Sequence, residues 1–201
     1  FIWISTLNGL NRYDGHSFVT FLPQKDNTPS LNDQHINKMD EDKNGFLWIS
    51  SAYNIFSCYD LEHDRFVDYT GCGEYNEPYE NRMQTTDRKS WLWGETNGCR
   101  QIEDGDDVFL STILKNENGM LPSNKINFLV EDFCENIWIC TESGLARVSK
   151  DKTEILEWEH NFKAAIPYED GCYFLTYEGE IYYSEKGGEI ELVLSIKDAS
   201  Q

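Results

Sequence analysis

Four tryptophans recur along the chain at a fixed interval of 45 residues. They are Trp3, Trp48, Trp93 and Trp138, and each lies in a short apolar segment such as residues 46–51, which read FLWISS. A fifth, degenerate copy carries Phe174 in the tryptophan position. Self-similarity with a period of about 20–50 residues marks a repeat architecture in which each copy is one supersecondary unit. We therefore expect repeat units centred on these five aromatic residues.

Each repeat reads as several short strands. An apolar run such as residues 36–39 leads into an acidic turn at 42–45, where Asn and Gly tolerate positive φ angles. The tryptophan segment that follows is apolar on both faces, which is typical of a strand buried on both sides. Gly9 or Gly144 then turns the chain into a third strand, and residues 18–21 alternate as an outer, half-exposed strand should. Four strands per unit of about 40–45 residues predict the blades of an all-β, β-propeller fold.

Three motifs carry a resemblance to a known family. They are residues 45–50 (GFLWIS), residues 6–14 (TLNGLNRYD) and residues 121–127 (LPSNKIN), the last followed by Glu131 and Asp132. Together they resemble the two-component regulator propeller repeat, and the resemblance covers nearly the whole chain. The third unit departs from the pattern, because Gly98 comes one residue early and residues 101–104 (QIED) replace the expected Arg-Tyr-Asp.

The resemblance implies a function and a setting. In this family two seven-bladed propellers and a small β-sandwich precede a membrane helix, a histidine kinase, a receiver and a DNA-binding domain. The propellers form the periplasmic sensor of hybrid two-component systems in gut bacteria that degrade polysaccharides, and the sensor binds an oligosaccharide. By resemblance, residues 1–201 are expected to be part of the first propeller. Missing blades, a second propeller and a homodimeric partner would complete it, with the membrane reached only through a segment outside this chain.

The charge balance limits the partners. Seventeen Lys and Arg oppose thirty-six Asp and Glu, which gives a net charge of −19. Such a charge repels the phosphates of nucleic acids and anionic lipids, so nucleic-acid binding by this segment is not expected. It also favours a neutral oligosaccharide over a strongly anionic one. No apolar run of about 18 residues, the length that would span a membrane, occurs in the sequence.

The candidate ligand-binding residues are Tyr75, Tyr79 and Arg82. They belong to the least regular connection, residues 71–82, where polar residues replace the apolar strand expected near residue 81. Aromatic rings can stack on a sugar and a guanidinium can bind its hydroxyls, and loops carry function on rigid scaffolds. The alternative is that this acidic segment is only a solvated connection. The recurring tryptophans, in contrast, are expected to form the core, and Arg12 and Tyr13 to fix the blade.

Neither a metal, a cofactor nor a catalytic centre is expected. The histidines, His16, His35, His63 and His160, are scattered and read as surface residues, and residues 40–45 read as a turn instead of a calcium loop. Most of the six cysteines read as small buried hydrophobes, with Cys134 and Cys140 as the one pair close enough in sequence to suggest a disulfide. Carboxylate pairs such as Asp106 and Asp107 are not diagnostic in so acidic a chain.

Three functions therefore stay open at the level of sequence. The first is a non-catalytic sensor module that binds an oligosaccharide. The second is a propeller-fold glycan lyase or hydrolase, which would need converging acid and base residues that no motif reveals. The third is a non-catalytic protein-interaction scaffold. Stabilisation by a sugar without turnover would separate the first from the other two.

Overall fold

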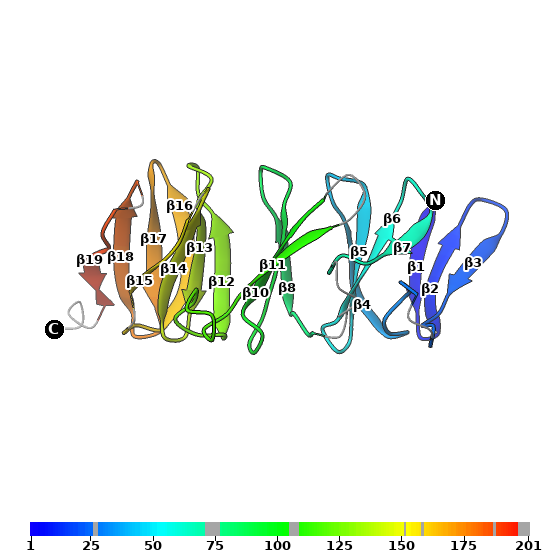
Figure 1. Ribbon diagram of the computed structural model, residues 1–201, viewed down its shortest axis with the longest axis horizontal. Helices are drawn as coiled ribbons and strands as arrows, with labels where there is room; N and C mark the ends of the chain where they lie inside the picture. The colour runs from blue at the N-terminus through cyan, green and yellow to red at the C-terminus, as the bar shows by residue number, and fades with distance from the viewer. Residues whose placement is uncertain are drawn as a thin grey trace. The chain divides into compact units, whose positions relative to one another are not determined.

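The structure is all-β. The computed structural model describes residues 1–25, 28–70, 77–104, 109–150, 152–157, 159–186 and 188–196. Within these ranges the chain forms nineteen β-strands in five sheets and no α-helix (Figure 1). In each sheet, strands that follow one another in the sequence lie side by side, and the recorded pairs are antiparallel. This confirms the prediction of four-stranded propeller blades, although the first sheet has three strands.

The strands follow the repeats closely. The first sheet contains β1 (Ile2–Thr6), β2 (Gly9–Tyr13) and β3 (Phe18–Phe21), and the second contains β4 (Ile36–Glu41), β5 (Phe46–Ser51), β6 (Phe56–Asp60) and β7 (Arg65–Val67). The third contains β8 (Asn81–Gln84), β9 (Ser90–Trp93), β10 (Cys99–Glu103) and β11 (Leu110–Leu114). The fourth contains β12 (Ile126–Glu131), β13 (Ile137–Thr141), β14 (Gly144–Ser149) and β15 (Lys152–Glu157). The fifth contains β16 (Phe162–Tyr168), β17 (Gly171–Thr176), β18 (Glu180–Glu185) and β19 (Glu191–Ser195).

The chain divides into two compact units. Residues 1–90 and 101–112 form the first, and residues 91–100 and 113–201 form the second. In the first unit, Leu10 and Leu31 pack with Leu47, Ile49 and Tyr59, and so join the first two sheets. In the second unit, a cluster around Trp138 and Phe174 joins the fourth and fifth sheets, with the two ring centroids 4.8 Å apart. Each core therefore lies between neighbouring sheets.

The tryptophan strands of the second and fourth sheets are buried on both faces, as predicted, whereas the prediction is wrong for β1 around Trp3, which is largely exposed. All six residues of β5 and all five of β13 are buried. Trp48 and Trp138 retain only 2% and 0% of their surface. Burial of an aromatic side chain of this size supplies a large hydrophobic free energy, which makes the repeated tryptophan a core residue and not a sugar platform.

The acidic turn before the tryptophan strand is a hydrogen-bonded cap in the second and fourth sheets. The backbone N–H of Asp42 donates to the carbonyl of Phe46 at 2.9 Å, and the Asp42 carboxylate accepts from the N–H groups of Asn44 and Phe46. Its second oxygen accepts the indole N–H of Trp48 at 2.7 Å. Asp132 makes the equivalent bond to Trp138 at 2.8 Å. The Asp42 and Asp132 carboxylates thus stabilise their turns, and residues 42–45 form the turn that the sequence predicts.

In the third sheet, the tryptophan that follows the hairpin turn lies two residues before the position given by the 45-residue spacing. Its hairpin closes with a 2.9 Å hydrogen bond from the N–H of Thr85 to the carbonyl of Lys89. The bond from Asp42 to Phe46 is the equivalent in the second sheet. The tryptophan two residues after this closure is Trp91, whereas the 45-residue interval selects Trp93. Trp91 is 1% exposed and Trp93 is 7% exposed. The Nε1 atom of Trp93 is buried and has no hydrogen-bond partner among the described residues.

Gly9 is required by close packing at the first hairpin. It adopts φ 101°, in the left-handed region that favours glycine. A Cβ at this position would lie 2.5 Å from the carbonyl oxygen of Phe21, which belongs to the backbone and cannot move aside. The glycine therefore lets β2 and β3 approach each other directly after the turn.

The cysteines behave mainly as core residues. Cys58, Cys99, Cys140 and Cys172 are free and buried, while Cys134 is free and exposed, so the suggested Cys134–Cys140 disulfide is absent. Burial raises the pKa of the Cys172 thiol to about 12. Cys72 lies outside the described residues.

We expect iodoacetamide to alkylate Cys134 rapidly in the native protein, because only an accessible thiol forms the reactive thiolate readily. The four buried thiols should react only after unfolding, with burial holding their pKa values high. Mass spectrometry of tryptic peptides taken over time measures both rates. Native labelling of Cys140 as fast as Cys134 would contradict the packing described above.

Candidate functional site

The structure places the three predicted binding residues in different surroundings. Arg82 lies within β8, so the expectation that the irregular connection extends through residue 82 is wrong: a strand forms there despite its polar sequence. Tyr79 is 1% exposed, and its backbone N–H donates to the carbonyl of Asn54 at 2.7 Å. Its hydroxyl donates to Oε2 of Glu77 at 2.8 Å. Tyr75 falls outside the described residues.

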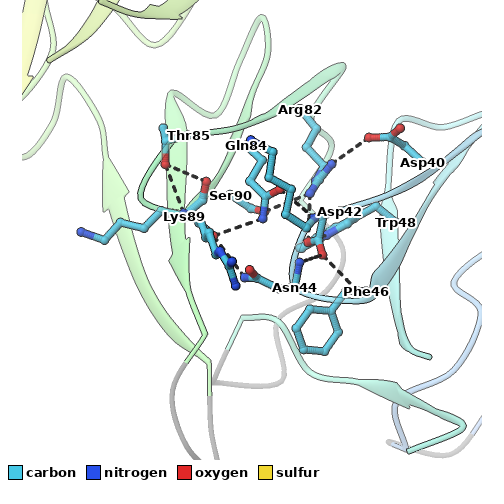
Figure 2. Close-up of polar contacts among 12 residues, drawn as sticks. Asp40, Asp42, Asn44, Phe46, Trp48, Arg82, Gln84, Thr85, Lys89 and Ser90 are labelled. Carbon is cyan, nitrogen blue, oxygen red and sulfur yellow. Dashed lines mark hydrogen bonds and ion pairs between the residues drawn. The ribbon is translucent and has the colours of Figure 1, made fainter. Parts of the chain in front are cut away.

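Arg82 forms the centre of a polar cluster (Figure 2). Its Nη1 donates to Oδ2 of Asp40 at 3.0 Å, and its Nη2 donates to Oδ2 of Asp42 at 3.1 Å. Nη2 also donates to Oγ of Ser90 at 3.1 Å. The guanidinium carbon lies 4.7 Å from the centroid of the Trp48 ring, within the range of a cation–π contact.

The cluster is mostly withdrawn from solvent. The side chains of Arg82 and Asp42 are 7% and 1% exposed, and only Asp40 is open, at 59%. Burial lowers the pKa of Arg82, and the charges of Asp42 and Asp40 oppose that shift. A buried guanidinium requires such carboxylate partners, because an unpaired charge in a low-dielectric interior is strongly unfavourable. The cluster therefore joins β8 to β4 and β5.

Further polar contacts tie the neighbouring hairpin turns together. The N–H of Lys43 donates to Oε1 of Gln84 at 2.9 Å, and Nδ2 of Asn44 donates to the carbonyl of Arg88 at 3.2 Å. Figure 2 shows Gln84 and Asn44 beside the Arg82 cluster. These partners are about 40 residues apart in sequence, and no local motif indicated them. The one sequence signal for this cluster was an aspartate that recurs six residues before the tryptophan, at Asp42 and Asp132.

Other sheet junctions use different chemistry. Arg12 donates to the hydroxyl of Tyr59 at 3.2 Å and pairs with Asp64. Tyr13 stacks on Phe18 with centroids 4.6 Å apart, so both residues support the blade, as predicted. In the second unit, Nδ2 of Asn127 donates to the carbonyl of Phe162 at 2.8 Å.

The described residues contain no group of three or more His, Cys, Asp or Glu side chains arranged to hold a metal ion. His35 and His63 lie at the surface, whereas His160 is half-buried, with Nε2 2.9 Å from the Tyr182 hydroxyl. The prediction that all four histidines are surface residues is therefore wrong for His160. Among the described segments, none is a helix long and apolar enough to cross a membrane.

Comparison with known proteins identifies the fold of this chain. No protein-family model and no curated protein sequence matches the chain. The structure is similar to the extracellular domain of a candidate hybrid two-component system from B. thetaiotaomicron, with 19% identity and a TM-score of 0.55 over 95% of this chain and 26% of that one. A second extracellular domain, from a candidate one-component system of the same organism, has 16% identity and a TM-score of 0.59 over 96% of this chain and 27% of that one. YCF48 from Cyanidioschyzon merolae has 9% identity and a TM-score of 0.50 over 95% and 68%.

These likenesses establish the β-propeller fold. The sequence identities are too low to assign more than the fold. The chain spans about a quarter of the length of the two extracellular domains that it resembles, at 26% and 27%. The number of blades in the complete ring stays a prediction.

Proposed function

We propose that this chain is part of the extracytoplasmic sensor of a hybrid two-component regulator. The sensor binds an oligosaccharide in the periplasm and signals to a cytoplasmic histidine kinase that controls genes for polysaccharide use. The observation that carries the proposal is the structural likeness, over 95% and 96% of the chain, to extracellular domains of bacterial signalling systems. The motifs around Trp48 and Leu121 support it independently, through their resemblance to the two-component regulator propeller repeat.

The two carboxylates that recur with the tryptophan repeats serve the fold. A glycoside hydrolase needs two carboxyl groups on either side of a sugar, about 5–10 Å apart. Asp42 and Asp132 are buried in separate turns, where indole and backbone N–H groups occupy their oxygens. These two recurring carboxylates are therefore engaged by the fold and are poorly placed to act on a glycosidic bond.

We further propose that the sugar contacts the connection that contains Tyr75. Tyr79 and Arg82 would then hold the end of this connection against the second and third sheets through their contacts with Asn54, Asp40 and Asp42. Blades outside this chain, a second propeller and a homodimeric partner complete the assembly in this proposal. Ligand binding transmits a signal only if the ligand binds two arrangements of that assembly with different affinity.

A thermal-shift experiment tests the proposal. The complete protein and the 201-residue chain are melted in parallel with neutral and acidic oligosaccharides, and the products are assayed for new reducing ends and unsaturated sugars. A ligand at about 100 times its Kd stabilises the native state by about 2.7 kcal/mol, which raises the melting temperature by several degrees. We expect one glycan class to stabilise the complete protein without being consumed.

The other outcomes separate the alternatives. Release of sugar products would replace the sensor with an enzyme. Neither stabilisation nor turnover with any glycan would favour a protein-interaction scaffold. A shift in the complete protein that is absent from the 201-residue chain would place the binding site outside these blades.

A further inference from the structure

Asparagine is followed by glycine at residues 8–9, 44–45, 97–98 and 118–119. An Asn-Gly pair can lose the side-chain amide of the asparagine without an enzyme, because glycine has no side chain to keep its backbone nitrogen away from the amide carbon. The reaction requires an amide group that solvent reaches and that is free to rotate. The exposure and hydrogen bonding of the four asparagines therefore decide which pair reacts in the native protein.

The amide group of Asn8 is exposed and unrestrained. Asn8 lies in the two-residue turn between β1 and β2, which the pairing of Thr6 with Gly9 closes. The turn itself is held, because the N–H of Asn8 donates to Oγ1 of Thr6 at 3.2 Å and the Thr6 hydroxyl donates to the carbonyl of Gly9 at 3.1 Å. Residue 8 is exposed, and among the described residues its side chain has no recorded hydrogen-bond partner.

The other three asparagines are restrained or less accessible. Asn118 is also exposed, but its Oδ1 accepts from the N–H of Lys115 and its Nδ2 donates to the carbonyl of Ile113, both at 3.0 Å. Asn44 is half-buried, and its Nδ2 donates to the carbonyl of Arg88 at 3.2 Å. Asn97 is half-buried as well. The structure thus separates Asn8 from three pairs that are identical to it in local sequence.

We infer that Asn8 is a site of spontaneous deamidation in the native protein. The backbone nitrogen of Gly9 attacks Cγ of Asn8 and closes a succinimide ring, and the side-chain nitrogen leaves as ammonia with the proton of the Gly9 N–H. Water then opens the ring at either of its carbonyls. The product has a carboxylate at position 8 and is joined to Gly9 through the ordinary main chain or through the side-chain carbon, as an isoaspartyl link. The sum is one water consumed and one ammonia released.

The isoaspartyl product alters the first hairpin. It lengthens the main chain directly before Gly9, where a Cβ would already lie 2.5 Å from the carbonyl oxygen of Phe21. The same hairpin carries Trp3, whose ring centroid lies 5.0 Å from that of Tyr59 in the second sheet. A displaced β1 would therefore weaken the packing between the first and second sheets. Deamidation at Asn8 is independent of the proposed sensor function, because it involves only groups of this turn.

Mass spectrometry of tryptic peptides, taken from the complete protein as it ages in mildly alkaline buffer, measures the four rates. The four pairs fall on different tryptic peptides, and the one with Asn8 ends at Arg12. Asn8 should deamidate about tenfold faster than Asn118 in the native protein, because the hydrogen bonds of Asn118 must break before it reacts. The protein unfolded in guanidinium chloride is the matched control, since all four pairs should then react at similar rates.

Asn8→Gln tests the effect on the fold. Glutamine forms the corresponding ring much more slowly, and its side chain replaces an exposed one, so the variant should fold as the wild type does. Aged wild type should melt at a lower temperature than fresh wild type, whereas aged Asn8→Gln should keep its melting temperature. The isoaspartyl fraction at position 8 is measured with an isoaspartate-specific methyltransferase.

The contrary results are distinct. Equal native rates for Asn8 and Asn118 would overturn the assignment of the site. A lead of Asn8 that persists in guanidinium chloride would also overturn it, because the fold would then not be what selects this pair. An unchanged melting temperature after complete deamidation would overturn the effect on the sheet packing. None of these measurements uses a ligand, so their failure and that of the sensor proposal are separate.

Discussion

Replacing Asp42 with alanine is expected to lower the free energy of unfolding by about 3–5 kcal/mol, the range for removing one partner of a buried ion pair. The substitution removes the acceptor of the Trp48 indole and of two backbone N–H groups, and it takes one carboxylate from the buried guanidinium of Arg82. Chemical denaturation followed by tryptophan fluorescence measures the change.

Asp132→Ala is the matched control, because it removes the same kind of turn cap without removing a partner of Arg82. Asp132 caps its turn and accepts from Trp138 as Asp42 does from Trp48, but its recorded hydrogen bonds include no arginine. Its loss should cost about 1–3 kcal/mol, the penalty for buried donors left unsatisfied. Adding Arg82→Met to Asp42→Ala should recover part of the loss, because the unpaired charge is removed as well. Equal costs for Asp42→Ala and Asp132→Ala would contradict a role for Arg82 in stability.

Trp138→Ala is expected to cost about 3–5 kcal/mol, as large-to-small substitutions of buried aromatic residues do. Trp138 is fully buried, packs on Phe174 and donates to Oδ2 of Asp132, so its loss leaves a cavity and removes one of the two hydrogen bonds to that oxygen. Equilibrium denaturation of the variant, monitored by circular dichroism, measures the loss.

Phenylalanine substitutions distinguish the two kinds of tryptophan. Trp138→Phe should cost about 1–3 kcal/mol, because it removes a buried hydrogen bond. Trp93→Phe should change stability by less than about 1 kcal/mol, since the Nε1 atom that it removes has no partner among the described residues. A larger loss for Trp93→Phe than for Trp138→Phe would contradict the absence of a hydrogen-bond partner at Nε1 of Trp93.

The blades could be predicted from the sequence because each depends on local signals. The period of the tryptophans, the turn at Asp42 and the glycine at Gly9 are all visible within a few residues of the strands that they set. The register of the third sheet was not visible, because Trp91 and Trp93 are both apolar candidates and only the bond from Thr85 to Lys89 separates them. Periodicity alone selects Trp93, whereas the hairpin closure aligns Trp91 with Trp48.

The surroundings of the predicted binding residues could not be deduced in the same way. Arg82 lies in a polar stretch that reads as a loop, yet its partners Asp40 and Asp42 belong to the preceding repeat and supply the charge that lets a strand form there. Arg12 likewise contacts Tyr59 and Asp64, which lie about 50 residues further along the chain. Contacts of this range depend on how the sheets stack, and a single sequence does not encode that stacking in any local pattern.

Three sheet junctions use different polar contacts, so each of them requires its own pair of partners. A chain built of near-identical repeats risks docking the wrong pair of units as it folds. Here Arg82 requires the carboxylates of the second sheet, Arg12 requires Tyr59 and Asp64, and Asn127 requires the backbone at Phe162. A sheet placed beside the wrong neighbour would bury a cation or an amide without its partner, and that penalty disfavours incorrect pairing at these three junctions.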